Sequence, residues 1–371
     1  MNQLSSRKKI LMVNLSKSWG GGEQWFLMVG KGLRERGWEV KWLVYPGSKL
    51  AEKLVSENLP FQAMKLRFLN LLNPILTIRL FTFLQSFAPN YLLLNASHEL
   101  KTAGWVGKWA KIPHIIFRRG VSYPLSDSTW NHKMMHEVVT AFIGNSKATF
   151  DAVTGRFPIL LKKPHIYFNN AIDLSQWPQR NAWTPQRSIG IVARLAHEKG
   201  LDRAIEAMAL LKVRGAKATL HIWGTGPERQ KLVDGIEEKD LGDRVFLEGF
   251  TGNVREAMLR CDIFAFPSRY GEGTAIALIE AMATGLPCVV FDTPALAEVV
   301  LDQETGYVVE DGNIKAYADV LEKLLKDPDL ADRLGKAGRK RAETHFSLDH
   351  LMNQLQNFLL SLGEKESEEK K

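Results

Sequence analysis

The chain has 371 residues, of which 45% are hydrophobic and 24% are charged. These are the proportions of an ordinary folded protein, so they exclude a fibrous or disordered chain, and the length predicts two domains. Two cysteines, Cys261 and Cys288, are too few for a disulfide scaffold. We expect both to be buried, reduced thiols.

No stretch reaches the roughly 18 consecutive apolar residues that span a bilayer. The best candidate, residues 275–291, is interrupted by Glu280, Gly285 and Pro287. Near the amino terminus a basic triplet precedes the apolar residues 10–13, which are too few for the core of a signal peptide. We therefore expect a cytoplasmic protein that can lie peripherally on the cytoplasmic face of the membrane.

The net charge of +8 is unevenly distributed. Residues 1–180 contain 24 Lys and Arg against 10 Asp and Glu, a net charge of +14, whereas the remainder contains 25 against 31, a net charge of −6. A basic half indicates an anionic partner, such as membrane headgroups, a phosphorylated acceptor or nucleic acid. The alternative is a generic solubilising surface.

In the first half, short apolar runs alternate with amphipathic stretches. The runs are continuous, as is typical of parallel strands that are covered on both faces. Strands are predicted at residues 10–15, 40–45, 91–94, 114–117 and 139–143. Helices are predicted at residues 23–36, 74–87 and 146–154. This alternation predicts a doubly wound α/β sheet.

The same pattern restarts in the second half. Strands are predicted at residues 187–193, 218–223, 245–247, 263–266 and 288–291. Helices are predicted at residues 201–208, 227–238, 275–284 and 314–325. The polar residues 176–185, with two prolines, separate the halves as a linker.

The fold class is therefore α/β, with two Rossmann-like domains that face each other across a cleft. We predict an amino-terminal domain at residues 1–173 and a carboxyl-terminal domain at 174–345. A helix at 346–363 is expected to pack back toward the first domain. A charged tail follows at 364–371. Ligands of such sheets bind at the carboxyl ends of the strands.

Three consecutive glycines follow the first predicted strand, and among them Gly21 and Gly22 are the candidate ligand contacts. Glycines allow close approach of a ligand to the backbone, and the following helix presents N–H groups and its positive dipole end to an anion. The spacing is not G-x-G-x-x-G, so a dinucleotide site is poorly supported. The alternative is a tight strand–helix turn.

A second candidate loop follows the strand at 187–193. Arg194 and Lys199 lie five residues apart in it, so both could point at one anionic group. Ordinary surface charge is the alternative. A third loop, Gly224-Thr225-Gly226-Pro227, follows the next strand and gives only a weak signal for close ligand approach.

The strongest motif follows the strand at 263–266. Glu272 is expected in a loop, and Glu280, eight residues later, inside a helix with apolar neighbours. A carboxylate in that position needs a partner, and sugar or ribose hydroxyls are suitable ones. The alternative is a structural glutamate that bonds within its own domain.

These motifs together resemble the family-four retaining glycosyltransferases of the GT-B fold, the glycosyl transferases group 1. That family has two glutamates separated by seven residues and then A-M-A-x-G-x-P-V; here Glu272 and Glu280 are followed by Ala-Met-Ala-Thr-Gly-Leu-Pro-Cys-Val. The resemblance covers nearly the whole chain. It is strong over 187–310 and thin over 45–140, where acceptor specificity resides in such enzymes.

The resemblance implies roles for individual residues. Arg194, Lys199, Glu272 and His98 would act in catalysis: the two cations on the donor diphosphate, Glu272 on the donor sugar and His98 near the reacting sugar, with a structural role as the alternative for His98. The donor-binding set would be Gly21, Gly22, Gly224, Gly249, Phe250, Gly273, Thr274, Ala275 and Glu280. In it, Glu280 would hold the ribose, and Gly249 and Phe250 would lie near the base.

The sequence departs from the family pattern at two positions. Thr274 stands where the family has an aromatic residue, and Ala171 replaces the glycine of the hinge motif. Neither change removes a charged group. No His and Cys cluster has metal-ligand spacing, so we expect no metal and no cofactor, with Arg194 and Lys199 stabilising the leaving diphosphate instead.

The resemblance implies sugar transfer from a UDP- or GDP-type donor by same-face attack. The basic half and the apolar-basic stretch at 65–72 favour a lipid-linked or anionic acceptor at the inner membrane surface, such as a cell-envelope glycolipid or lipopolysaccharide; buried packing is the alternative for that stretch. An epimerase of the same fold and a non-catalytic sensor remain alternatives. A phosphorylase lacks its pyridoxal-lysine context, and the acidic second half disfavours nucleic acid.

Overall fold

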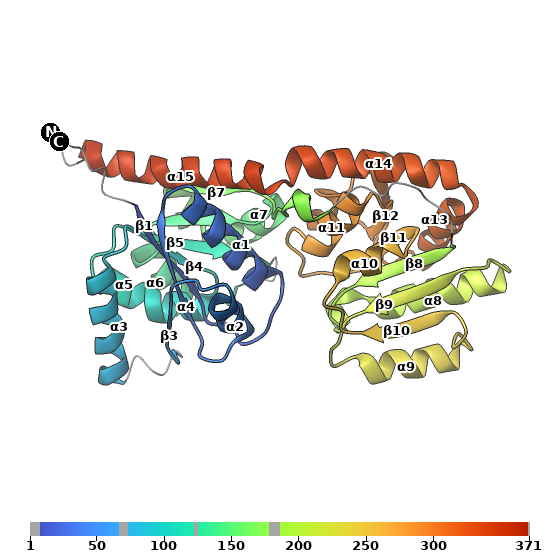
Figure 1. The fold of residues 1–371 in the computed structure, drawn as a ribbon, viewed down its shortest axis with the longest axis horizontal. Coiled ribbons are helices and arrows are strands. Elements are labelled where there is room, and N and C mark those ends of the chain that lie inside the picture. The colour runs from blue at the N-terminus through green and yellow to red at the C-terminus, as the bar shows by residue number, and fades with distance from the viewer. Residues whose placement is uncertain (1–7, 67–72, 122–124, 178–185, 370–371) are drawn as a thin grey trace. The chain divides into compact units, whose positions relative to one another are not determined.

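The computed structural model describes residues 8–66, 73–121, 125–177 and 186–369 (Figure 1). It divides into two compact units. The first comprises Met1–Phe168 together with Leu351–Lys371, and the second is Asn169–His350. Most of the predicted linker and residues 67–72 of the apolar-basic stretch lie outside the described residues.

The first unit is built on a seven-stranded sheet with the order β3-β2-β1-β4-β5-β6-β7. Its strands are β1 (Lys9–Asn14), β2 (Glu39–Val44), β3 (Phe61–Ala63), β4 (Tyr91–Leu94), β5 (His114–Arg119), β6 (Ala141–Gly144) and β7 (His165–Tyr167). All strand pairs in the described part of the chain are parallel. The central strands are buried on both faces, which explains their continuous apolar sequences.

Helices pack against this sheet (Figure 1). They are α1 (Gly21–Glu35), α2 (Lys49–Ser56), α3 (Pro74–Phe87), α4 (Ser97–Glu99), α5 (Trp105–Trp109), α6 (Thr129–Glu137) and α7 (Lys147–Arg156). A π-helical turn, η2 (Leu100–Gly104), joins α4 to α5 without a break. Such π turns inside a helix are rare and often occur at functional sites.

The second unit contains a six-stranded sheet with the order β10-β9-β8-β11-β12-β13. Its strands are β8 (Ser188–Val192), β9 (Thr219–Trp223), β10 (Val245–Gly249), β11 (Ile263–Phe266), β12 (Cys288–Phe291) and β13 (Gly306–Val309). Its helices are α8 (Leu201–Val213), α9 (Arg229–Glu238), α10 (Val254–Leu259), α11 (Ile276–Thr284), α12 (Pro294–Ala297), α13 (Ile314–Lys326) and α14 (Pro328–His345). Both sheets are therefore doubly wound: strands are first added on one side of the first strand of the unit, and later strands are added on its other side.

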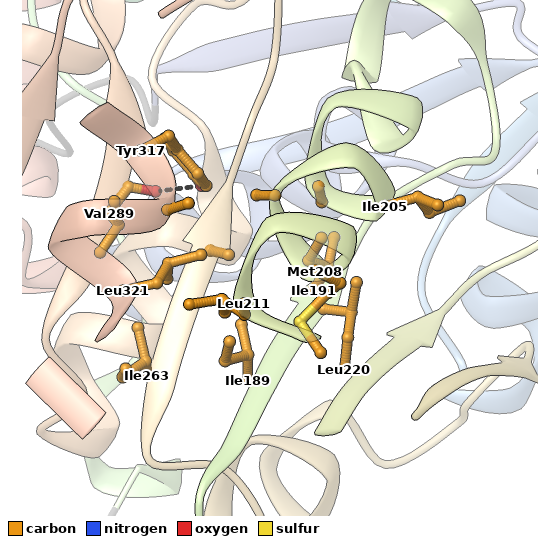
Figure 2. Close-up of a cluster of buried hydrophobic side chains, with 14 of the residues drawn as sticks. Ile189, Ile191, Ile205, Met208, Leu211, Leu220, Ile263, Val289, Tyr317 and Leu321 are labelled. Atoms are coloured by element: carbon orange, nitrogen blue, oxygen red, sulfur yellow. Dashed lines mark hydrogen bonds between the residues drawn. The ribbon is translucent and has the colours of Figure 1, made fainter. Parts of the chain in front are cut away.

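Apolar side chains from α8, α13 and the strands that these helices cover form one core of the second unit (Figure 2). Its single internal polar contact in that view is made by Tyr317, whose hydroxyl donates to the carbonyl of Val289 over 2.9 Å. The free thiols of Cys261 and Cys288 are buried on the other side of the sheet, as predicted. This core holds the carboxyl ends of the strands rigidly in place.

The chain returns to the first unit through α15 (Leu348–Glu369). The side chain of Met352 lies against Gly32 of α1, and Arg36 donates to Gln356. The helix runs past its predicted end at residue 363. The expected tail at 364–371 is therefore helical as far as Glu369, because Glu and Lys are good helix formers.

The second unit begins at Asn169, earlier than the predicted start at 174. Asn170 donates to the carbonyl of Thr274 over 2.7 Å, and Ile172 pairs with Ser347 as an isolated bridge. These contacts tie the hinge segment to the second unit. In the part of the chain that the structure covers, no helix is long and apolar enough to cross a membrane.

Candidate functional site

The predicted donor residues of the second unit gather at the carboxyl edge of its sheet. The loops after β8, β9, β10 and β11 carry them, and parallel strands end at the same edge. Strands β8 and β11 are neighbours although β9 and β10 lie between them in sequence. The crevice beside such a reversal is where ligands bind in open α/β sheets.

Arg194 and Lys199 take different partners. The Arg194 guanidinium bonds to Glu198 within its own loop and its side chain is 66% exposed. Lys199 Nζ instead donates to Glu272 Oε1 over 2.5 Å, across from the β8 loop to the β11 loop. The structure therefore joins Lys199 to Glu272, and the convergence of both cations on one anionic ligand stays a prediction.

Gly200 explains how the two loops come so close. It has φ +62°, and a Cβ atom there would lie 2.2 Å from the carbonyl oxygen of Pro267. Only glycine fits both the left-handed backbone and this approach. Lys199 is thereby fixed beside the loop that carries Glu272.

The glycines after β9 serve backbone packing. A Cβ atom on Gly224 would lie 1.8 Å from the carbonyl oxygen of Ala193, so this loop rests on the β8 loop. The predicted helix start at Pro227 is slightly early, since α9 begins at Arg229. Of the residues predicted near the base, Gly249 ends β10 and Phe250 follows it with 75% exposure. Their contact with a donor stays a prediction.

Glu272 is a buried carboxylate with two side-chain donors. It is 8% exposed, and its Oε1 accepts from Lys199 and also from the Ser268 hydroxyl over 2.8 Å. The ammonium group of Lys199 has three N–H donors, of which this pair uses one. The arrangement presents a positive charge that is held in position and can still meet a ligand.

The segment Gly273, Thr274 and Ala275 leads directly into α11, with Ala275 as its first cap residue. The Thr274 hydroxyl donates to Asn169 Oδ1 over 2.8 Å, and its carbonyl accepts from Asn170. The threonine that departs from the family pattern is thus bonded to the hinge asparagines. The amino-terminal amides of α11 follow it and supply the positive end of a helix dipole.

Glu280 lies inside α11 and is 7% exposed, as its apolar neighbours predicted. Its backbone carbonyl accepts from the Thr284 hydroxyl over 2.8 Å. The structure thus places one carboxylate in the loop and the other in the helix, as the sequence spacing predicted. The ribose contact of Glu280 stays a prediction.

The sequence reasoning missed one acidic motif. Asp327, Pro328 and Asp329 form an Asp-x-Asp sequence, the type of motif that holds a metal in many metal-dependent glycosyltransferases. Here Asp327 caps α14, because its Oδ1 accepts from the N–H of Leu330 over 3.0 Å. Within the described ranges, no group of three or more His, Cys, Asp or Glu is placed to hold a metal ion.

The candidate residues of the first unit lie at the corresponding reversal, between β1 and β4. Gly21 and Gly22 open α1, and His98 lies in α4 after β4. The His98 side chain is half exposed, and partial burial lowers its pKa. The imidazole is therefore neutral at neutral pH, so it can accept a proton.

Beneath these residues lies a buried polar group that sequence reasoning missed. Arg118 at the end of β5 is fully buried, stacks 3.9 Å above the Trp25 ring and donates to Asn95 Oδ1 over 2.9 Å. Glu99 is equally buried and accepts from backbone amides. Burial lowers the pKa of Arg118 to about 9, so it stays charged at neutral pH. A glutamate at the third position of a helix is a capping signal that could have indicated Glu99.

Residues 175–341 match the model of the family described as glycosyl transferases group 1. The chain carries a glycosyl transferases group 1 domain. This group 1 domain fills most of the second unit and contains Lys199, Glu272 and Glu280. The group 1 match does not extend into the first unit, which includes residues 45–140, where the resemblance was thin.

Curated relatives of the group 1 domain include two enzymes of Staphylococcus aureus. The chain is 28% identical over 177 residues to poly(ribitol-phosphate) alpha-N-acetylglucosaminyltransferase, covering 47% of this chain and 36% of the relative. It is 29% identical over 187 residues to the capsular polysaccharide biosynthesis glycosyltransferase CapM, covering 49% of this chain and 48% of the relative. The matched segment therefore spans about half or less of these relatives.

The fold is similar to that of Anabaena HepE, whose crystal structure is a complex with UDP and glucose. The TM-score is 0.85 at 18% identity, over 96% of this chain and 100% of that chain. At this identity the likeness shows the fold alone. The two parallel-sheet units have the GT-B fold.

Proposed function

We propose that the chain is a retaining glycosyltransferase that moves a sugar from a UDP- or GDP-type donor to an acceptor hydroxyl. The observation that carries the proposal is the Lys199–Glu272 pair beside the start of α11, in a group 1 domain with Glu280 buried in the same helix. Its support is chemical: this edge offers a cation and helix amides to a diphosphate, and a carboxylate to hydroxyl groups.

In the proposed reaction, negative charge develops on the nucleotide diphosphate as its bond to the sugar breaks. Lys199 and the amides at the start of α11 stabilise that charge, which is where preorganised donors contribute most to the rate. Glu272 holds Lys199 in place and contacts the donor sugar. Arg194 lies at the exposed side of the same loop and can reach the diphosphate by leaving Glu198.

The remaining roles are those that the resemblance implies. Glu280 binds the ribose hydroxyls, and neutral His98 acts at the reacting sugar. As the resemblance implies, the acceptor oxygen bonds to the anomeric carbon on the face from which the nucleotide diphosphate departs, the acceptor proton passes to the departing phosphate oxygen, and the configuration is retained. Determining the anomeric configuration of the product by NMR tests this step, and an inverted product contradicts it.

The acceptor we propose is a lipid-linked or anionic cell-envelope molecule at the inner membrane face. Two S. aureus relatives are named for poly(ribitol-phosphate) and capsular polysaccharide, and the first 180 residues carry a net charge of +14. Exposed Ile75 and Ile78 on α3, and Trp109 on α5, offer apolar contacts for a basic protein at an anionic interface.

Vesicle sedimentation tests the membrane part of this proposal. We expect the protein to bind vesicles with anionic headgroups at low salt and to be released as salt screens the charges. The double variant Ile75→Glu, Ile78→Glu should weaken this binding, whereas Val213→Glu, at an equally exposed apolar position in the second unit, should not. Equal binding to neutral and anionic vesicles would argue against a membrane acceptor.

The activity itself is tested in two steps. A thermal-shift screen of nucleotide sugars identifies the donor, and nucleotide release is then measured with and without envelope glycolipid extracts. A transferase releases nucleotide in an acceptor-dependent way. An epimerase converts the donor without an acceptor, and a sensor binds the donor without turnover. Either of those results would replace the proposed function.

We also propose that transfer needs no metal, with Lys199 and Arg194 in the metal's place. Turnover in EDTA is therefore expected to equal turnover in untreated buffer. Restoration of activity by added Mg²⁺ or Mn²⁺ after EDTA treatment would contradict this part of the proposal. That result would not affect the assignment of the donor site to the group 1 domain.

A further inference from the structure

Glu99 joins the ends of two neighbouring strands of the first unit. Its Oε1 accepts from the N–H of Leu15, directly after β1, over 2.7 Å. Its Oε2 accepts from the N–H groups of Asn95 and Ala96, directly after β4, over 2.7 and 2.9 Å. The residue is 1% exposed, so the carboxyl group has exchanged water for these three amides.

The two segments joined by Glu99 carry the candidate residues of the first unit. The chain after Leu15 leads to the glycine turn and α1, and the chain after Ala96 leads to His98. The two segments also touch each other, since a Cβ atom on Gly22 would lie 3.3 Å from Asn95 Nδ2. The spacing between Gly22 and His98 therefore depends on what holds Asn95 and Leu15 together.

We propose that Glu99 is a positioning residue, whose two carboxylate oxygens hold the glycine turn after β1 and the His98 turn after β4 at a fixed separation. This inference rests on the proposed function, in which both turns face the donor. Glu99 itself is too buried to touch a substrate. The π turn that follows it, Leu100–Gly104, starts immediately after this junction.

The link requires both oxygens of Glu99 to accept, and therefore the ionised form. Protonation or replacement by glutamine puts a donor on one oxygen position. If the donor takes the place of Oε1, the hydrogen bond from Leu15 is lost. If it takes the place of Oε2, the hydrogen bonds from both Asn95 and Ala96 are lost. The Leu15 link is therefore the one that is lost, and the local cap at Ala96 persists.

The charged and titratable groups around Glu99 are few. Glu23 on α1 repels it, His98 Nε2 lies 4.0 Å from its Oε1, and Arg118 on β5 donates to the side chain of Asn95 beside it. Burial raises the pKa of Glu99 to about 7, although its three amide donors work in the opposite direction. The link between the two turns should therefore weaken as the pH falls below about 7.

Amide hydrogen exchange of the full chain, resolved to single residues, tests the link directly. In Glu99→Gln at pH 8 we expect the Leu15 amide to exchange about ten-fold faster than in the wild type, with Ala96 unchanged. The matched control is Glu57→Gln, the same substitution on the surface of the first unit. Equal exchange of Leu15 in wild type and Glu99→Gln would overturn the inference.

Donor kinetics separate positioning from simple support of the fold. A positioning role predicts that the kcat/KM of the wild type falls as the pH drops through about 7. It also predicts that the kcat/KM of Glu99→Gln is lower than that of the wild type at pH 8 and does not show this fall. Wild-type kinetics in Glu99→Gln, despite faster Leu15 exchange, would refute the positioning role. If the wild type turns over no donor, the proposed function fails, and the exchange data still decide whether Glu99 joins the turns.

Discussion

The two units share one sheet topology but hold their charges in opposite ways. At the strand reversal of the second unit, Lys199 and Glu272 form a pair near the surface, with side chains 21% and 10% exposed. At the reversal of the first unit, Glu99 and Arg118 are almost fully enclosed. A charge within reach of solvent can bind a ligand, whereas an enclosed charge acts through the backbone that it holds. In the functions that we propose, the same site on two similar sheets thus serves once for binding and once for alignment.

Replacing Lys199 tests the binding side of this comparison and should have the largest effect. Lys199→Ala removes the held cation, and we expect donor turnover to fall by about a hundred-fold or more, the size typical of a lost transition-state donor. Glu280→Ala should abolish the donor-induced thermal shift. Both are measured by nucleotide release and thermal shift with the donor found in the screen.

The control for Lys199→Ala is Lys326→Ala, which also removes a lysine paired with a glutamate, Glu322, but on α13. It should keep wild-type activity. Wild-type donor affinity in both Lys199→Ala and Glu280→Ala would show that the site lies elsewhere. The second unit would then lose its role as the binding half of the comparison.

Much of the fold could be predicted because burial dictates apolar runs. The strands at 91–94, 263–266 and 288–291 and the helix at 74–87 have the predicted bounds, since each run is continuous and ends at a turn residue or a cap. The short strands β3, β7 and β13 were not predicted, and neither were several helices, among them α2, α6 and α14. A four-residue strand gives little periodic signal, and α14 buries mostly small residues.

The site was predicted unevenly for a physical reason. Glu272 and Glu280 are close in sequence, so their spacing determines that one lies before a helix and the other inside it. The bonds from Lys199 to Glu272 and from Glu99 to Leu15 connect residues 73 and 84 positions apart. Such contacts depend on which strands become neighbours, and composition and spacing do not determine that.

Gly200 offers a test of how closely the binding loops must approach. Gly200→Ala would bring a Cβ atom to 2.2 Å from the Pro267 carbonyl oxygen at a positive φ. We expect it to lower the free energy of unfolding by about 3 kcal/mol. Gly215→Ala is the control, because its φ is also positive but nothing lies within 4 Å of the added atom. Its cost should be about 1 kcal/mol.

Chemical denaturation of both glycine variants measures this difference. If the two substitutions cost the same, the close approach of the β8 and β11 loops contributes nothing beyond backbone strain. Lys199 and Glu272 would then be held by their own ion pair alone.

The enclosed charge of the first unit should be visible in the pH dependence of stability. Because the pKa of Glu99 is raised to about 7, the folded protein holds this proton more tightly than the unfolded chain does. Its contribution to stability is therefore fully present below the unfolded pKa and is lost as the pH rises to about 7. We expect the loss to be on the order of 2 kcal/mol.

Comparison with Glu99→Gln isolates this contribution, since glutamine does not titrate. We measure the free energy of unfolding of both proteins at pH 4.5 and pH 8. Relative to Glu99→Gln, the wild type should be more stable at pH 4.5 than at pH 8. The same difference in free energy of unfolding at both pH values would mean that the pKa of Glu99 is not raised. Glu99 and Glu272 would then differ only in their positions and partners.

Thr274 gives the smallest expected effect and tests whether the hinge asparagines support the binding loop. Thr274→Val keeps the shape but removes the hydroxyl that donates to Asn169 over 2.8 Å, which should cost about 1 kcal/mol in the free energy of unfolding. Thr344→Val, at an exposed helical position, should change it by less than about 0.5 kcal/mol. Donor affinity supplies the second readout. If Thr274→Val weakens donor binding more than it weakens the fold, the hinge segment helps to shape the loop before α11. If only stability changes, the asparagines anchor the hinge, and the donor loop is set by Gly200 and Lys199 alone.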